Sequence, residues 1–329
     1  MIRAGTRARI EAAHRFGAFY RGYLASHYPM ALVSLDAMGA DDAALDRFGG
    51  RYLANLEPIG SAVVTIAPGD EAAHMGSPRA FPEWVAYFDA AIAADGIEGV
   101  LARWIDRLLP AVAAGAFHGA IRTAYALETG SPREVAHALA YWAAAYESLP
   151  ELPPPAGGLS CDEVLDAVAR DPAFAGKRPP GSNILERTTA AARKPELAAH
   201  VAATDPSRLD LDAVARALIR AYAASGNFTL LHGVTGTHAF RLLAPHASEP
   251  DAALRDLWAA LVAAYVGAGA PCVEGWGLSG ADSLDWPAIH GRALDRDDEH
   301  DIKLAYTCWR EWQHRGDDLY RRAASARLA

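Results

Sequence analysis

The sequence predicts an all-α protein, a bundle-like single domain over residues 1–329 with a Pro/Gly-rich middle segment. Alanine dominates the composition, with leucine and arginine behind it, and all three residues favour helices. Apolar residues recur at helical spacing in most segments of the chain. Only residues 61–70, with the sequence "SAVVTIAPGD", are typical of a strand, and that segment is short. The length allows one large domain or two ordinary ones.

Helical spacing and turn residues together indicate where the helices lie. Ser131 before Pro132 is a cap followed by a proline that is favoured in a first turn, and Gly96 is a candidate C-cap. In the first part of the chain we expect helices over about 7–25, 28–38, 41–56, 81–94, 96–113, 116–129 and 132–149. Further on we expect them near 160–170 and over about 207–225, 227–244, 250–267 and 297–325.

Two segments rich in helix breakers, 150–158 and 171–183, flank the short helix in the middle of the chain. We therefore predict an irregular segment over 150–205, which either links two lobes or covers a pocket. Residues 267–287 are Gly-rich and are expected to be irregular. The GxG at 267–269 follows a helix and lacks a third glycine, so it is not a dinucleotide fingerprint. If the protein uses NADPH, no recognisable motif holds it.

Charge, cysteine content and hydropathy exclude several classes of protein. The formal net charge of −9 is spread along the chain without a basic stripe, which argues against a nucleic-acid partner. Cys161, Cys272 and Cys308 form no CxxC pair, which argues against a disulfide framework or a zinc ribbon. The N-terminus lacks the apolar core of a signal peptide, and no uncharged apolar run is long enough for a membrane span. We expect a cytoplasmic protein without a membrane partner, of open oligomeric state.

Five of the twelve histidines lie where a helix should bury carbon. They are His27, His118, His232, His238 and His300. Neutral imidazole is the commonest metal ligand in proteins, and histidines on the inner faces of several helices suit a metal site in a bundle core. The alternative is that each is a core histidine with its own hydrogen-bond partner.

Helical spacing groups these histidines with other polar side chains. His300 and Lys303 share one helix face, and so do His118, Arg122 and Tyr125. His232 and His238 are six residues apart, which is about 240° around a straight helix. Both can face one point only if the "GVTG" between them breaks or bends the helix. We therefore favour His232 as the metal ligand. We expect His238 either to support the ligands without binding the metal itself, or to act on the substrate.

Lys303 stands out because the chain has only three lysines against 28 arginines. It lies in an apolar helical run, so beside imidazoles and a cation its ammonium would have to lose its charge. A neutral amine either ligates a metal weakly or reacts with CO2 to give a carbamate, which is an oxygen donor suited to Fe or Mn. The alternative is that Lys303 reaches solvent and pairs with a nearby carboxylate, namely Asp298, Glu299 or Asp301.

Several segments together resemble the questin oxidase-like family, in the family's order from about residue 16 to about 312. The most specific are the patterns FHGxIRxAYAxE, LHxVTxxHAxR and HxIKL. The resemblance implies a helical fold, a non-haem iron or another metal, and oxygen insertion into ring substrates such as anthraquinones. NADPH-dependent Baeyer–Villiger oxidation is also ascribed to the family. Residue by residue, the resemblance falls on His27, His118, His232, His238, His300 and Lys303.

The function that we expect is that of an oxygenase with a mononuclear metal, Fe or alternatively Mn or Zn. The expected ligands are His27, His118, His232 and His300. Lys303 is expected either as a carbamate ligand or as a group that supports the histidines without binding the metal. Arg122, Tyr125 and His238 are the expected catalytic residues, with Arg122 fixing a phenolate or carboxylate. An electron-rich, polyketide-like aromatic or quinoid substrate would react with O2 and stack on aromatic side chains such as Tyr125, Trp142, Trp276 or Trp286.

Two alternatives remain open. One is an NADPH-dependent Baeyer–Villiger-type monooxygenase that needs no metal. The other is a non-catalytic helical protein that binds a metal or a hydrophobic small molecule. The sequence names neither the substrate nor a required reductant.

Overall fold

The computed structural model describes residues 2–22, 24–272 and 283–329, and within them the fold is all-α, as the sequence predicts. The first helices are α1 (Ala4–Ala12), α2 (Tyr28–Ala37), α3 (Asp42–Tyr52), α4 (Glu71–His74), α5 (Phe81–Leu108), α6 (His118–Thr129) and α7 (Pro132–Ala144). The middle helices are α8 (Cys161–Arg170), α9 (Ile184–Ala192) and α10 (Pro195–Ala202). The last helices are α11 (Leu211–Ser225), α12 (Phe228–Leu243), α13 (Pro250–Gly267), α14 (Trp286–Leu294), α15 (Glu299–Arg315) and α16 (Asp318–Leu328).

The sheet in the described ranges is a two-residue hairpin, in which β1 (Phe19–Tyr20) pairs antiparallel with β2 (Leu24–Ala25). Among the described residues, no helix combines the length and the apolar character needed to cross a membrane. Ser131 caps α7 by accepting a hydrogen bond from Glu134 N, with Pro132 in the first turn, as expected.

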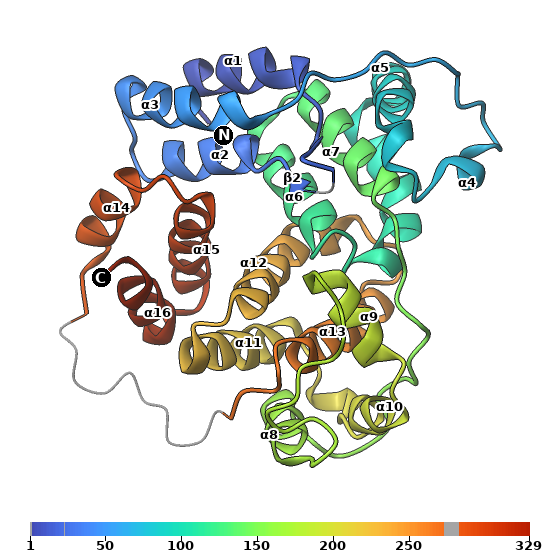
Figure 1. The fold of residues 1–329 in the computed structure, drawn as a ribbon, viewed down its shortest axis with the longest axis vertical. Helices are drawn as coiled ribbons and strands as arrows, with labels where there is room; N and C mark the ends of the chain where they lie inside the picture. The colour runs from blue at the N-terminus through green and yellow to red at the C-terminus, as the bar shows by residue number, and fades with distance from the viewer. Residues whose placement is uncertain (1, 23, 273–282) are drawn as a thin grey trace.

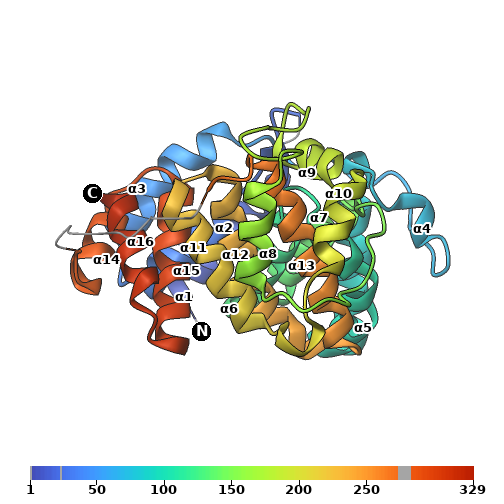
Figure 2. The same ribbon diagram turned by 90° about the horizontal axis from the view of Figure 1, so that it is seen from below.

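The two ends of the chain share one core. Helix α12 packs against α6, α11, α13 and α15, and α2 packs against both α6 and α15. Figure 1 shows the blue α2 beside the red α15, with α6 and α12 in the middle of the molecule. The helices of the middle segment, α8, α9 and α10, pack on α11 and α13 (Figure 2). The starts of α2, α6, α12 and α15 are thereby brought together.

Helix α12 is buried along most of its length, and two glycines let its neighbours come close. A Cβ at Gly236 would lie 3.1 Å from Phe117 Cβ, and one at Gly233 would lie 3.0 Å from Leu218 Cδ1. The helix runs without a break through "GVTG". His232 and His238 therefore reach different neighbours, as their angular separation requires.

Two predictions for the N-terminal part are wrong. The helix expected over 7–25 ends at Ala12, where a 3-10 turn (Ala13–Arg15) leads into extended backbone. Arg21 (φ 48°) and Gly22 (φ 88°) then take the left-handed conformations of the hairpin turn, which a continuous helix could not contain. The strand expected over 61–70 is irregular, and Val63 is 85% exposed. A strand needs a neighbour for its backbone hydrogen bonds, and the described part of the chain offers this segment none.

Other boundaries also differ from the expectation. The segment 150–205 contains α9 and α10 besides α8, so it is less irregular than predicted. Helix α14 begins at the end of the Gly-rich region, and the helix expected over 297–325 is two helices, because Gly316 (φ 73°) ends α15. Gly96 (φ 71°) does break α5 into two limbs at the predicted place.

Candidate metal centre

Four of the five histidines singled out by the sequence form a closed ring between α2, α6, α12 and α15. The ring centroids of His27 and His118 are 4.4 Å apart, and those of His118 and His232 are 4.9 Å apart. His300 closes the ring, 5.2 Å from His232 and 4.7 Å from His27. Nitrogen atoms of His27, His118 and His300 all lie within 4.8 Å of one another. A single ion placed among them could reach several nitrogens at once.

All four histidines lie at or near the start of a helix. His27 is the N-cap of α2, His118 is the first residue of α6, and His300 is the second residue of α15. His232 is the fifth residue of α12. Helix starts carry a partial positive charge, which disfavours a charged imidazolium and favours the neutral form of each ring.

The turn before His118 is a run of left-handed residues. Gly115, Ala116 and Phe117 have φ of 55°, 59° and 67°. For the two residues that carry a Cβ, this conformation costs of order 1 kcal/mol each. The turn aims the carbonyl oxygen of Gly115 at Nδ1 of His118, with which it forms a short hydrogen bond. The backbone strain therefore lies in the turn that orients the imidazole of His118.

Hydrogen bonds fix the tautomer of at least two of the rings. A carbonyl oxygen can only accept, so Nδ1 of His118 donates to Gly115 O and Nδ1 of His232 donates to Phe228 O at 2.8 Å. Each ring then carries its lone pair on Nε2, and the Nε2 of His118 is buried with no hydrogen-bond partner. Hydrogen bonds of this kind, made by the ring nitrogen that does not bind the metal, typically orient metal-binding histidines.

The other two rings face carboxylates. Nδ1 of His300 lies 3.0 Å from Asp298 Oδ1, within hydrogen-bonding distance. Nδ1 of His27 lies 3.2 Å from Glu299 Oε1, but the angles do not make a hydrogen bond, and this buried nitrogen has no other partner. Glu299 Oε1 is also 3.6 Å from Nδ1 of His300. One carboxylate therefore lies beside two rings of the cluster.

Burial keeps the imidazoles neutral. It lowers the pKa of His27 well below the usual value, and the nearby Lys303 lowers it further. Burial, and next the neighbouring histidine, also lower the pKa of His118 and of His232 well below the usual value. Burial lowers the pKa of His300 as well, although Asp298 opposes that shift. Neutral imidazole is the form that binds metals.

Lys303 is fully buried next to the ring of histidines. Its Nζ has no hydrogen-bond partner among the described residues. Burial lowers its pKa to about 8, although Glu299 and Asp298 raise it in part. The alternative that Lys303 reaches solvent is wrong, because the side chain is 0% exposed. Asp301, one of its expected partners, instead accepts from Arg327 Nε at 2.6 Å.

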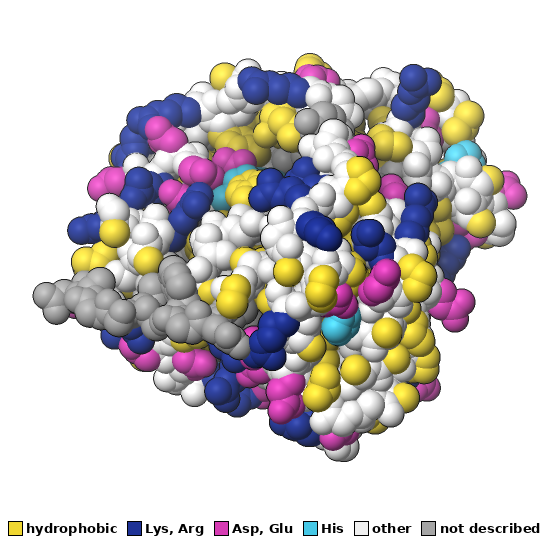
Figure 3. Space-filling view, turned by 60° about the horizontal axis from the view of Figure 1, so that its bottom comes forward, with side chains coloured by type: hydrophobic (Ala, Val, Ile, Leu, Met, Phe, Trp, Pro, Cys, Tyr) yellow, Lys and Arg dark blue, Asp and Glu magenta, His cyan; other side chains and the backbone are white. Residues whose placement is uncertain are grey.

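A cavity of about 520 Å³ lies over the ring. The four histidines and Glu299 form part of its wall, and the rest comes from five other segments of the chain. The remaining lining residues are Tyr20, Leu24, Ala25, Gly115, Ala116, Tyr141, Ser182, Asn183, Ile184, Leu185, Arg187 and Phe228. Figure 3 shows the molecule hollowed on one face, with a histidine side chain at the hollow between acidic and basic side chains.

A model of the questin oxidase-like family matches residues 24–308 of the chain. The chain belongs to the questin oxidase-like family. The matched range contains all four histidines of the ring and Lys303, and it confirms the resemblance seen in the sequence. No curated protein matches the chain. The description of the family points to an oxidase, and therefore to an oxidoreductase.

The structure does not bring the three expected catalytic residues of this questin oxidase-like protein to the cavity. Arg122 Nε donates to Glu134 Oε1 at 3.0 Å, in a buried pair between α6 and α7. Tyr125 OH lies 3.2 Å from Thr307 Oγ1. Nδ1 of His238 lies 2.7 Å from Glu311 Oε1. Each of the three has its own partner outside the lining of the cavity.

The aromatic side chains that we expected to stack on a substrate also lie elsewhere. Trp142 is fully buried and donates to Ala111 O at 3.1 Å. Trp286 packs against Trp312 on α15, with ring centroids 5.4 Å apart. Trp276 lies outside the described residues. The rings that do line the cavity are Phe228, Tyr20 and Tyr141.

Sequence reasoning missed several residues of the cavity. Glu299 precedes His300, and Phe228 is one helical turn before His232, so their spacing could have indicated them. Tyr20 and Tyr141 follow from no pattern that we read in the sequence. Arg187 lies in the segment that was expected to be irregular, and no spacing connects it to a histidine.

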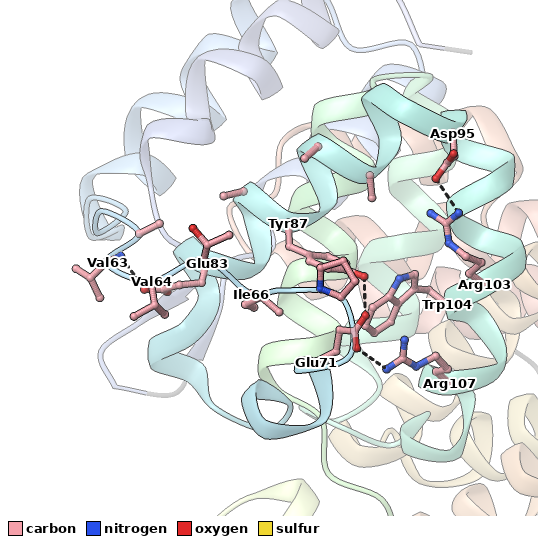
Figure 4. Close-up of a pocket in the computed structure, with 16 residues that line it drawn as sticks. Val63, Val64, Ile66, Glu71, Glu83, Tyr87, Asp95, Arg103, Trp104 and Arg107 are labelled. Atoms are coloured by element: carbon pink, nitrogen blue, oxygen red, sulfur yellow. Dashed lines mark hydrogen bonds and ion pairs between the residues drawn. The ribbon is translucent and has the colours of Figure 1, made fainter.

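A larger cavity of about 690 Å³ lies between the two limbs of α5 and residues 62–71 (Figure 4). No histidine is among its described lining residues, and its arginines face carboxylates. Arg103 pairs with Asp95 at 2.7 Å, and Arg107 lies 3.9 Å from Glu71. The smaller cavity over the ring is the better candidate, because it holds buried nitrogens that lack partners.

Proposed function

We propose that this protein is a metal-dependent oxygenase that inserts oxygen into an aromatic or quinone-type small molecule. The observation that carries the proposal is the ring of neutral histidines, in which hydrogen bonds leave lone pairs free. His27, His118, His232 and His300 would hold the metal. Imidazole suits iron, which is the proposed metal, with manganese or zinc as alternatives. When bound, iron supplies the redox chemistry that activates O2.

The residues present fit a cation. Buried polar atoms without partners are rare and costly in folded proteins. Here Nε2 of His118, Nδ1 of His27 and Nζ of Lys303 are all buried without one. A metal ion would engage imidazole nitrogens of this set, and the carboxylates of Glu299 and Asp298 would offset part of its charge.

Lys303 is proposed either as a carbamate or as a neutral amine that lies next to the imidazoles without binding the metal. No described carboxylate forms an ion pair with it, so a protonated ammonium would lie unpaired beside a cation. In carbamate formation, the lone pair of Nζ attacks the carbon of CO2. The C–N bond forms as one C=O π bond of CO2 opens, the nitrogen releases one proton to water, and an anionic carboxylate results. The charge of the side chain changes from neutral in the amine to negative in the carbamate, which favours a bound cation.

The substrate side of the site is aromatic. The ring of Phe228 lies 4.7 Å from the rings of both His232 and His300, which places an apolar face directly beside the cluster. Tyr20 and Tyr141 form other parts of the wall. A cavity of about 520 Å³ is of the size that usually binds small molecules. An electron-rich ring fits between these aromatic walls, which also keep water away from the reacting atoms.

Oxygen consumption tests the proposal. The protein, loaded anaerobically with Fe(II) and then exposed to O2, should consume oxygen with members of a panel of phenolic and quinone substrates. The same protein treated with a chelator should not. Consumption that persists without metal and requires NADPH would instead support a Baeyer–Villiger-type monooxygenase. No consumption under any of these conditions would favour a protein that only binds a metal or a small molecule.

A further inference from the structure

The cavity over the histidine ring has one basic residue among its described lining residues, Arg187 on α9. A guanidinium has five N–H donors. Nη1 of Arg187 donates to Gly181 O at 3.2 Å, and the buried Nε has no acceptor. Hydrogen bonds from Ser182 lower the pKa of the neighbouring Glu186 and the charge of Arg187 helps to lower it, but the two side chains make no direct ion pair among the described contacts. The guanidinium therefore keeps its charge and most of its donors for another partner.

Two arginines that face the core elsewhere, Arg122 and Arg241, bring their own carboxylates. Arg122 pairs with Glu134 at 3.0 Å, and Arg241 pairs with Glu311 at 2.9 Å. Glu186 is next to Arg187 in the chain, but its carboxylate accepts from Ser182 N at 2.7 Å and from Asn183 Nδ2 at 3.0 Å. The half-buried guanidinium of Arg187 therefore lines the cavity without a carboxylate held against it, which leaves its donors available to an anionic ligand.

The backbone holds Arg187 in place. Helix α9 packs on α13, where a Cβ at Gly267 would lie only 3.4 Å from Thr188 N. Gly181 has φ of 148°, and a Cβ there would lie 2.8 Å from Arg187 N and 3.0 Å from Arg187 Cγ. Only glycine permits this approach, so the loop before α9 presses against Arg187. Packing thus fixes the backbone and the first part of the Arg187 side chain, and the carbonyl of Gly181 holds one nitrogen of the guanidinium.

We propose that Arg187 binds a carboxylate on the substrate, and that the substrate class of this site is an aromatic carboxylic acid. Arginine matches the planar carboxylate with charge-assisted hydrogen bonds. The aromatic part would lie along Phe228 and the tyrosines, with the acid group at the α9 wall. The inference rests on the proposed function in one respect, since it takes the cavity over the histidine ring to be the substrate pocket.

Equilibrium binding of a matched pair of probes tests the inference. The probes are 2-naphthoate and its neutral analogue 2-naphthamide, titrated by calorimetry into the Fe(II)-loaded protein and into the protein as purified. The wild type should bind the acid about tenfold or more tightly than the amide, the size expected for a charge-assisted pair. Arg187→Gln should remove this preference with the amide affinity unchanged, and Arg187→Lys should retain part of it.

Arg193→Gln is the matched control, because Arg193 is an exposed residue at the C-terminal end of the same helix and does not line the cavity. It should bind both probes as the wild type does. Equal affinity of the wild type for acid and amide, or binding of neither, overturns the inference. So does an acid preference that survives in Arg187→Gln, because the carboxylate would then bind elsewhere in the site. Metal content separates the two proposals, since a metal-free wild type that prefers the acid contradicts only the proposed function.

Discussion

Nδ1 of His27 and Oε1 of Glu299 lie 3.2 Å apart and connect the start of α2 to the start of α15. The same carboxylate oxygen is 3.6 Å from Nδ1 of His300. Neither the N-terminal nor the C-terminal helices hold the cluster alone. The site therefore depends on the packing of α2 against α15, which joins two ends of the chain in one core.

Glu299→Gln should weaken metal binding without unfolding the protein. The substitution keeps the shape of the side chain but removes the negative charge beside two imidazoles. Loss of a group behind the ligands typically costs about 10- to 100-fold in metal affinity. Competition with a chelator measures the affinity, and Glu196→Gln, at an exposed site on α10, is the control. An unchanged affinity would show that Glu299 does not support the site.

His118→Ala and His232→Ala should each lose bound metal and remain folded, because each removes a proposed ligand. His238→Ala should keep its metal and instead lose stability by about 1–3 kcal/mol, since Glu311 is buried and loses a partner. Metal analysis and melting temperatures of the three variants check this. The assignment of the pair is wrong if His238→Ala loses the metal and His232→Ala retains it.

Lys303→Arg should be more damaging to metal binding than Lys303→Glu. Arginine keeps a positive charge that a protein cannot remove, and in this buried site that charge repels a cation. Glutamate supplies an anionic oxygen like that of a carbamate, although on a shorter side chain, so it should restore binding in part. Metal content with and without added bicarbonate separates the variants. An arginine variant that binds metal as well as the wild type does would place Lys303 outside the site.

Stability should fall in acid because of buried carboxylates such as Glu134. Burial alone would raise its pKa, but the charge of Arg122 and the hydrogen bond with His14 outweigh it and lower the pKa from the usual 4.5 to about 2. A carboxyl group whose pKa is lowered on folding stabilises the native state fully above its unfolded pKa. That stability is lost as the pH falls from about 4.5 to about 2.

The variant Glu134→Gln isolates this contribution. It should lower the free energy of unfolding at neutral pH by about 3–5 kcal/mol, because Arg122 is left buried without its counter-charge. The decline in stability between pH 4.5 and 2 should become shallower than in the wild type. Urea unfolding at a series of pH values measures both effects, with the exposed Glu147→Gln as control. An equal slope in the variant and the wild type would contradict the assignment.

Local signals predicted most of the fold. Long amphipathic segments, capped by Ser131 and interrupted at Gly96, produced helices where they were expected. The failures were short elements, such as α10 with eight residues, whose helical pattern spans only about two turns. The hairpin before α2 and the irregular residues 61–70 depend on whether a neighbouring strand exists, which is a property of the tertiary structure.

The sequence could predict the candidate site only from the spacing of residues within a single helix. The angle between His232 and His238 around the helix correctly predicted that the two side chains have different neighbours, because α12 is continuous. Arg122 shares a face with His118, but its pairing with Glu134 on α7 is a long-range contact that spacing cannot show. Arg187 reaches the cavity only because α9 packs on α13, so its position could not have been inferred from the sequence.

The metal content of the wild-type protein tests the central claim most directly. The protein should be purified without an affinity tag, loaded anaerobically with Fe(II), desalted and measured by elemental analysis. The ring of four histidines predicts about one equivalent of iron per chain, and this content should be lost in His118→Ala. Protein that holds no metal after loading would contradict the account, because the buried nitrogens of the ring would then have no ion to bind.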